Sequence, residues 1–362
     1  MLKLRFTTTA ATTALVASLV CATPALHGQK KGGAPVQSAN EQLVWPAPPA
    51  PARIKWTAEY RSEFDVGAKK RRSFIDRLAG KNEDVVRLKR PISVAVDEKG
   101  TIFVGDFGQG VVALDPIGKR MWRFSSVSGA ALNTPAGVAA DSKFVYATDT
   151  TTNTLTIFDK QGHRLTGLGP ADGLKRPVGV AVDEARDLLL VVNAGNHTVL
   201  LYNRALKLQK KIGERGSDSG QFNFPTFATF LPGGGFAITD TGNFRIQIFD
   251  ANGKFVRAFG KVGDVSGNFA RPKGIALDPD GNLHVVDAVF SNIQVFRQDG
   301  QLLTFVGRGG VAKGMFQIPS GIAIGKDGAI YVADEMNGRI QRLQYLSLPA
   351  AQAPAVVPAA AH

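Results

Sequence analysis

The sequence predicts an all-β fold: a six-bladed β-propeller of four-stranded blades, closed by an N-terminal strand that completes the last blade. Three observations predict it. A phrase that begins with proline occurs six times, short apolar runs follow in sets of four, and the last set lacks one run that an earlier segment can supply. The 40 glycines and 19 prolines among 362 residues agree with many short strands joined by tight turns.

The repeat starts at a proline that is followed by the phrase x-Gly-Val/Ile-Ala. The six prolines, of which the first and fourth open looser copies, are Pro91, Pro135, Pro177, Pro225, Pro272 and Pro319. Their spacing of roughly 40–50 residues is the length of one propeller blade. One blade cannot bury both of its faces, so we expect the units to close into a ring.

The fifth unit shows the strands that we expect in every blade. Its apolar runs are Gly274–Leu277, Leu283–Val286, Ile293–Phe296 and Leu302–Val306, and turns rich in Gly, Asp and Asn separate them. The inner runs are apolar at consecutive positions. This pattern predicts strands that are buried on both faces between two neighbouring sheets.

The sixth unit has only three runs, which are Gly321–Ile324, Ile330–Ala333 and Arg339–Leu343. Before the first unit, the strand-like segment from Ile54 to Tyr60 has no blade of its own. We predict that this segment fills the vacant fourth place and latches the ring. Such a latch removes two open sheet edges at once.

Three consecutive linkers between units place glycines and a phenylalanine in one register. The sets are Gly213, Gly216, Gly220 and Phe222; Gly260, Gly263, Gly267 and Phe269; and Gly307, Gly310, Gly314 and Phe316. A phosphate-binding loop would precede a helix N-terminus, whereas a strand follows here, so we predict no nucleotide site. The glycines allow positive φ in a tight crossing, and we expect the phenylalanines to plug the joints between blades.

Four regions are expected along the chain: a signal peptide (1–25), a Pro/Ala/Gly-rich linker (26–53), the propeller (54–346) and a disordered Ala/Pro-rich tail (347–362). Lys3 and Arg5 precede an apolar run from Ala10 to Ala22, and small residues follow it, as in a signal peptide. This run is too short to span a membrane. We therefore expect a monomeric propeller in the periplasm or outside the cell, without a transmembrane segment after cleavage.

Cys21 is the only cysteine, so a disulfide within the chain is excluded. A lipoprotein anchored through Cys21 is the alternative to simple secretion. Lipidation normally needs a small residue just before the cysteine, and Val20 stands there. We favour cleavage after Ala22 or Ala25.

Two units resemble NHL repeats in detail. The sixth carries Tyr331–Asp334 and then Asn337–Gln341 in the pattern Asn-x-Arg-Ile-Gln, and the fourth carries Asp240–Gln247. The first three units depart from the pattern, and the third has Asn193 where the others have Asp. The resemblance implies a propeller fold. It implies no single function, because the family includes protein and RNA binders, extracellular sensor domains and a few metal-dependent enzymes.

An acid ends the second strand of five units, and an amide ends it in the third. The series is Asp106, Asp149, Asn193, Asp240, Asp287 and Asp334. We favour a structural interpretation, in which each side chain accepts hydrogen bonds from backbone amides of its own hairpin. The alternative is a ring of acids around a cation, with Asp106, Asn193 and Asp240 as weak candidate ligands for calcium.

Basic residues gather where the first, third and fifth units enter their first strands. They are Lys89, Arg90, Lys175, Arg176, Arg271 and Lys273. Two interpretations stay open: an anion-binding mouth for an acidic protein or ligand, or side chains that pair with the Asp series and tie blades together. The formal net charge of +13 favours anionic partners in general. Lys69–Arg72 is interpreted as a solvated loop, and nucleic acid is not expected as partner of an exported protein.

The sequence carries no clear catalytic motif. The three histidines of the expected propeller, His163, His197 and His284, fall on different parts of a blade and are not expected to share a zinc ion. No Ser-His-Asp arrangement with an elbow motif is present. We therefore predict an exported binding scaffold without a cofactor. The alternative is a calcium- or zinc-dependent hydrolase or lyase that acts at the channel.

Overall fold

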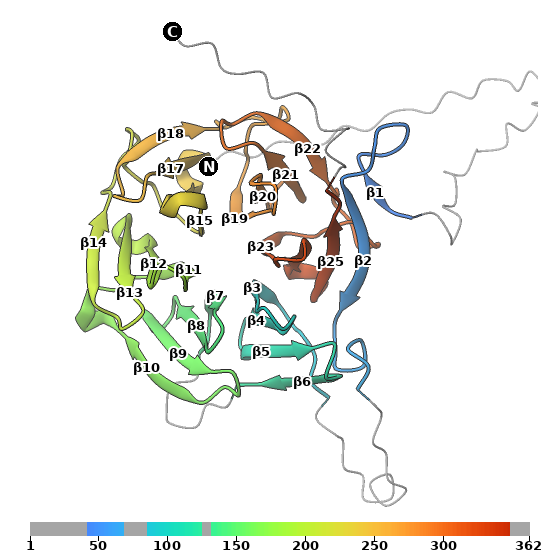
Figure 1. The fold of residues 1–362 in the computed structure, drawn as a ribbon, viewed down its shortest axis with the longest axis horizontal. Helices are drawn as coiled ribbons and strands as arrows, with labels where there is room; N and C mark the ends of the chain where they lie inside the picture. Colours follow the sequence, from blue (N-terminus) through green and yellow to red (C-terminus); the bar gives the residue numbers. More distant parts are fainter. Residues whose placement is uncertain (1–41, 69–84, 125–131, 348–362) are drawn as a thin grey trace, which may run out of the picture. The chain divides into compact units, whose positions relative to one another are not determined.

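The computed structural model describes residues 42–68, 85–124 and 132–347. They form six antiparallel sheets around a common centre, a six-bladed β-propeller (Figure 1). The predicted fold class and number of blades are confirmed. The predicted signal peptide, Cys21, the Lys69–Arg72 cluster and the tail from residue 348 lie outside the described residues.

The blades follow one another in chain order, and each runs from an inner to an outer strand. Blade 1 contains β3 (Pro91–Val96), β4 (Ile102–Asp106), β5 (Gly110–Asp115) and β6 (Arg120–Arg123). Blade 2 contains β7 (Pro135–Ala140), β8 (Phe144–Asp149), β9 (Thr154–Asp159) and β10 (Arg164–Leu168). Blade 3 contains β11 (Pro177–Asp183), β12 (Leu188–Asn193), β13 (Thr198–Asn203) and β14 (Leu208–Ile212). Blade 4 contains β15 (Ala228–Phe230), β16 (Phe236–Asp240), β17 (Arg245–Phe249) and β18 (Phe255–Phe259). Blade 5 contains β19 (Pro272–Leu277), β20 (Leu283–Asp287), β21 (Asn292–Phe296) and β22 (Leu302–Val306).

Blade 6 is built from both ends of the propeller. Its strands are β23 (Pro319–Ile324), β24 (Ala329–Asp334), β25 (Arg339–Tyr345), β2 (Ile54–Tyr60) and β1 (Val44–Trp45), in the order β1-β2-β25-β24-β23. The predicted latch is confirmed, since β2 pairs antiparallel with β25 along its length (Figure 1). The fifth strand, β1, lies in the range that the sequence assigned to the linker. Two residues carry no periodicity, so no sequence pattern marked this strand.

Short 3-10 helices occupy some of the connections. They are η1 (Pro170–Asp172), η2 (Ala194–Asn196), η3 (Pro232–Gly234), η4 (Thr241–Asn243) and η5 (Glu335–Asn337). The described residues contain no α-helix. None of their helices has the length and hydropathy that a membrane crossing requires.

The core consists of six apolar clusters, each in the joint between two neighbouring blades. Phe222, Phe269 and Phe316 are fully buried in three of these joints, as predicted. The preceding glycines make room for the rings. Gly307 has a φ of +82°, and a Cβ there would lie 2.4 Å from the ring of Phe316.

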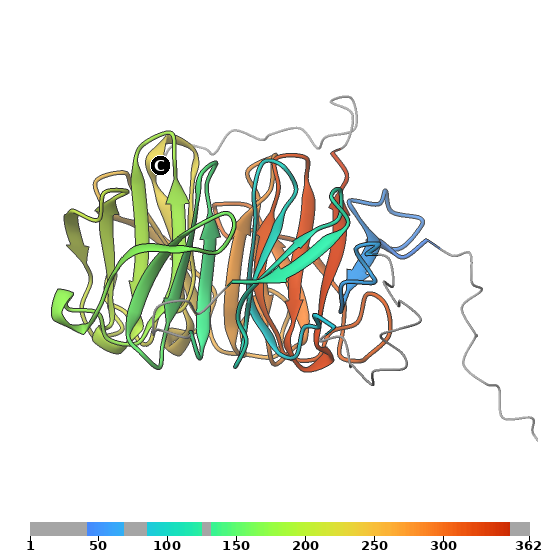
Figure 2. The ribbon, with the colours of Figure 1, turned by 90° about the horizontal axis from the view of Figure 1, so that it is seen from below.

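The disc has two faces that carry different connections. We call the face with the blade-to-blade connections and the second-to-third-strand hairpins the crossover face, and the other the opposite face (Figure 2 shows the disc edge-on). Backbone hydrogen bonds join the two kinds of segment on the crossover face, for example Phe107 N–H to Arg90 O and Ala288 N–H to Arg271 O, both at 3.0 Å. The predicted gathering of hairpins and connections on one face is confirmed.

Candidate functional site

The acid and amide series at the ends of the second strands is buried on the crossover face. Each member accepts a hydrogen bond from a backbone N–H of the connection that leads into its own blade; for Asp106 the donors are Lys89 at 2.8 Å and Arg90 at 2.6 Å. Asp149 and Asp287 also bind amides of their own hairpins. The backbone-amide interpretation holds, but the main donors belong to the connection and not to the hairpin.

The weak candidate metal ligands Asp106, Asn193 and Asp240 lie in three different blades. Each uses its polar atoms within its own blade: Asn193 with Lys175 and Gly173, and Asp240 with its hairpin and with Arg245. The structure therefore does not bring these three side chains together. Within the described ranges, no group of three or more His, Cys, Asp or Glu side chains is arranged to hold a metal ion.

The six candidate basic residues all lie on the crossover face, close to the start of a first strand. The side chains that are exposed there are Lys89, Arg90, Lys175, Arg176 and Arg271, whereas Lys273 is only 16% exposed. In the described part of the chain, none of the six side chains forms an ion pair with the Asp series. The series bonds instead to backbone N–H groups of four of these residues.

Glu335 brings two of the six cations together. Its carboxylate, 6% exposed, lies 2.6 Å from Nη2 of Arg90 and 3.4 Å from Nζ of Lys273. This cluster joins blades 5, 6 and 1 at the mouth of the channel. Burial lowers the pKa of Lys273; Glu335 opposes that shift, and the nearby Arg271 adds to it. The local excess of cations is a feature that an anionic partner can neutralise.

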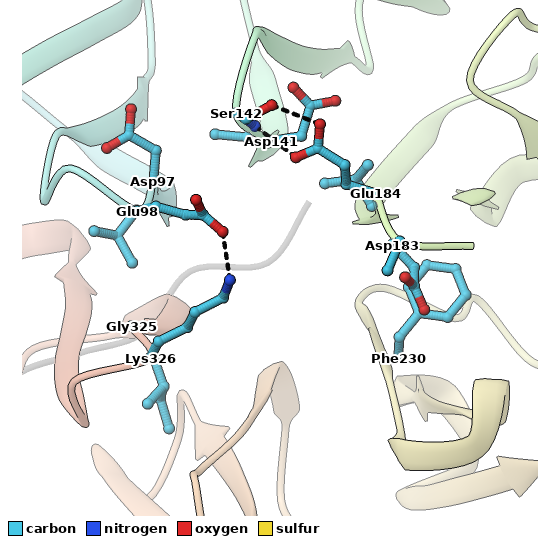
Figure 3. A pocket seen from close by; sticks show the side chains of 14 residues that line it. Asp97, Glu98, Asp141, Ser142, Asp183, Glu184, Phe230, Gly325 and Lys326 are labelled. Carbon is cyan, nitrogen blue, oxygen red and sulfur yellow. Dashed lines mark hydrogen bonds and ion pairs between the residues drawn. The ribbon is translucent and has the colours of Figure 1, made fainter. Parts of the chain in front are cut away.

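A cavity of about 680 Å³ opens at the centre of the opposite face (Figure 3). Its walls include the ends of first strands, such as Val96, Ala140 and Ile324. Its rim carries five carboxylates and one cation, and these are Asp97, Glu98, Asp141, Asp183, Glu184 and Lys326. Lys326 follows the first strand of blade 6 and pairs with Glu98 of the neighbouring blade 1 (Figure 3).

The carboxylates of this rim have partners within the described residues. Asp97 pairs with Lys160 at 3.1 Å, and Asp141 with Arg204 at 2.9 Å. Burial raises the pKa of Asp141, but hydrogen bonds from the hydroxyl of Tyr146 and from two backbone amides outweigh it, so the pKa lies below its ordinary value. The rim is therefore a set of ion pairs rather than a free cluster of acids.

Sequence reasoning did not identify the rim. The signal was an acid at or directly after the end of the first strand, which blades 1, 2 and 3 share in Asp97, Asp141 and Asp183. The histidines lie where the sequence placed them: His197 follows η2, His163 lies between β9 and β10, and His284 lies within β20.

Comparisons with known proteins support the repeat and the fold. The NHL repeat family matches residues 222–249 and 316–343, in blades 4 and 6. A structural genomics protein of unknown function from Bacteroides thetaiotaomicron is 19% identical, with 71% of this chain and 70% of that chain covered and a TM-score of 0.58. A streptogramin B lyase is 16% identical, with 72% and 95% covered and a TM-score of 0.54. A virginiamycin B lyase from Staphylococcus aureus is 14% identical, with 71% and 95% covered and a TM-score of 0.50.

These structural likenesses concern the fold alone, because all three identities are below 20%. No curated protein matches the sequence.

Proposed function

We propose that this six-bladed β-propeller, which carries NHL repeats in blades 4 and 6, serves as an exported binding scaffold whose crossover face captures an acidic protein or ligand. The observation that carries this proposal is that arginine stands before the first strand in only three of the six blades. Arginine precedes the first strand in blades 1, 3 and 5, as Arg90, Arg176 and Arg271. The same place holds Thr134, Phe224 and Ile318 in blades 2, 4 and 6.

A residue that builds the blade should recur in every blade, as the Asp and Asn series does. The arginines do not recur in this way, so the fold does not require them. Arg176 and Arg271 have no side-chain hydrogen bond or ion pair among the described residues. Arg90 forms an ion pair with Glu335. Unpaired, exposed cations around one mouth favour association with an anionic surface.

The test replaces Arg90, Arg176 and Arg271 together by alanine and measures binding of poly-L-glutamate as an acidic probe. We expect affinity at low salt to fall about tenfold, since three exposed charges each contribute ~0.2–1 kcal/mol, and the loss to shrink at high salt. The matched control replaces Arg164, Arg257 and Arg297, which are exposed away from the crossover face. If both triple variants lose the same affinity for poly-L-glutamate, the loss comes from net charge alone, and the proposed binding surface is overturned.

Export is part of the proposal and rests on the pattern of residues 1–25. The mass of the protein recovered from the cell envelope or medium should correspond to a chain that begins after Ala22 or Ala25. A mature protein that retains residues 1–25 in the cytoplasm would remove export from the account.

The alternative activity, a metal-dependent hydrolase or lyase at the channel, is decided by the same purified protein. Metal content and lactone and ester hydrolysis are measured side by side. Stoichiometric calcium or zinc together with turnover would replace the scaffold proposal.

A further inference from the structure

A second cavity, of about 350 Å³, lies between blades 1 and 2 on the opposite face. It is separate from the crossover face and shares Asp97 and Ser142 with the lining of the channel cavity. Three cations line it, Lys99, Arg120 and Lys160, together with the aromatic side chains Phe103 and Trp122. We propose that this cavity binds a small organic anion that carries a ring, either a carboxylate or a phosphate monoester.

Two of the cations are held in place by aromatic rings and carboxylates. The guanidinium of Arg120 lies 4.6 Å from the ring centre of Trp122 and 3.2 Å from Asp115. The ammonium of Lys160 lies 4.7 Å from the ring centre of Phe103 and 3.1 Å from Asp97. Lys160 is the better fixed of the two, because its side chain is 19% exposed and that of Arg120 is 67% exposed. A group that is already fixed loses little conformational entropy when a ligand binds, which favours affinity.

The charge of the lining selects an anion. Asp97 is the single acid among the residues that line this cavity, and Asp115 pairs with Arg120 from outside the lining, so three cations face two acids. The side chain of Lys99 has no hydrogen bond or ion pair within the described ranges, so its ammonium can approach a bound anion. The neighbouring channel cavity has the opposite balance, with five carboxylates and Lys326.

The aromatic wall is not part of the repeat. Trp122 pairs with Ala113 in blade 1, and the same register position is polar in the other four-stranded blades. The equivalent residues are Thr166, Lys210, Arg257 and Thr304. The fold therefore works without an aromatic side chain here. A tryptophan next to free and fixed cations supplies an apolar surface for the ring of a ligand.

The volume limits the ligand. Pockets for small molecules run from ~300 to ~1,000 Å³, so about 350 Å³ suits one ring with one charged substituent. A polymer or a folded protein surface does not fit this space.

The test is calorimetric titration of the full chain with phenyl phosphate and benzoate. Inorganic phosphate supplies the charge without the ring, and benzyl alcohol the ring without the charge. We expect saturable binding of phenyl phosphate or benzoate with a Kd of ~1 mM or tighter, and at least about tenfold weaker binding of both half-probes.

Two variants locate the site. Trp122→Thr introduces the residue that blades 2 and 5 carry, and Lys99→Ala removes the free ammonium; each should weaken binding about tenfold. Lys143→Ala removes an exposed charge that does not line the cavity, and it should bind like the parent. Three outcomes would overturn the proposal. Neither phenyl phosphate nor benzoate saturates the protein, inorganic phosphate binds with equal affinity, or both site variants bind like the parent. None of these outcomes bears on the crossover face.

Discussion

One polar side chain at the end of each second strand joins two parts of its blade. Asp287 accepts hydrogen bonds from Ala270 and Arg271 in the connection and from Val289 and Phe290 in the hairpin. A buried carboxylate is costly unless several donors satisfy it. The recurrence of the acid in sequence predicted a structural role. The donors in the connection were not predictable, because they lie some 16–17 residues earlier in the chain and only the closed blade brings them near.

Asp278 is a buried acid outside that series, and it makes the free energy of unfolding depend on pH. Its side chain and that of His284 are both fully buried, with Oδ2 3.0 Å from Nε2. Burial raises the pKa of Asp278, but hydrogen bonds from His284 and Asn282 outweigh it, so the pKa lies below its ordinary value. A lowered pKa in the folded state stabilises the protein above the unfolded pKa of about 3.9, and this stabilisation is lost as the pH falls through the folded value.

We predict that Asp278→Asn lowers the free energy of unfolding at pH 7 by ~1–3 kcal/mol. The difference from the parent should shrink below about pH 4, where the parent also loses its carboxylate. Urea unfolding at pH 7 and near pH 3 measures both effects. Asp299→Asn is the control, because that side chain is 44% exposed and its loss should matter little at either pH. A difference that is the same at both pH values would contradict the role assigned to the charged form.

Among the elements, β2 has the largest consequence for the fold. It supplies the fourth strand of blade 6, and its buried ends, Ile54 and Tyr60, belong to the apolar clusters on the two sides of that blade. The sequence predicted this strand because the sixth unit lacked a run. It did not predict β1, where Trp45 packs against Gly314, because that contact joins residues far apart in the chain.

Removal of β2 should therefore open the ring. We compare a chain that begins at Gln42, which keeps β1 and β2, with one that begins at Glu63, which lacks both. We expect the shorter chain to unfold at a temperature lower by at least ~10 °C, because two apolar joints become exposed and two sheet edges open. The chain that begins at Gln42 should melt like the parent. Equal melting of the two truncated chains would contradict the latch.

The whole molecule presents different charge at its two mouths. Exposed arginines and lysines lie on the crossover face at the entries of blades 1, 3 and 5, and Glu335 pairs with Arg90 and Lys273 there, whereas the opposite mouth carries a rim of paired carboxylates. The sequence predicted the first feature, because the cations stand directly beside the repeated prolines. It missed the second, because the rim acids look like ordinary turn residues until the ring brings them around one cavity.

The central claim is that an acidic partner binds the crossover face, and protection of single cysteines tests it most directly. Without residues 1–25 the chain has no native thiol. Asn133→Cys places an exposed thiol on the crossover face, and Ala185→Cys places one at the opposite mouth. We expect poly-L-glutamate to slow alkylation several-fold at position 133 and to leave position 185 unchanged. Protection at position 185 with none at position 133 would contradict the account.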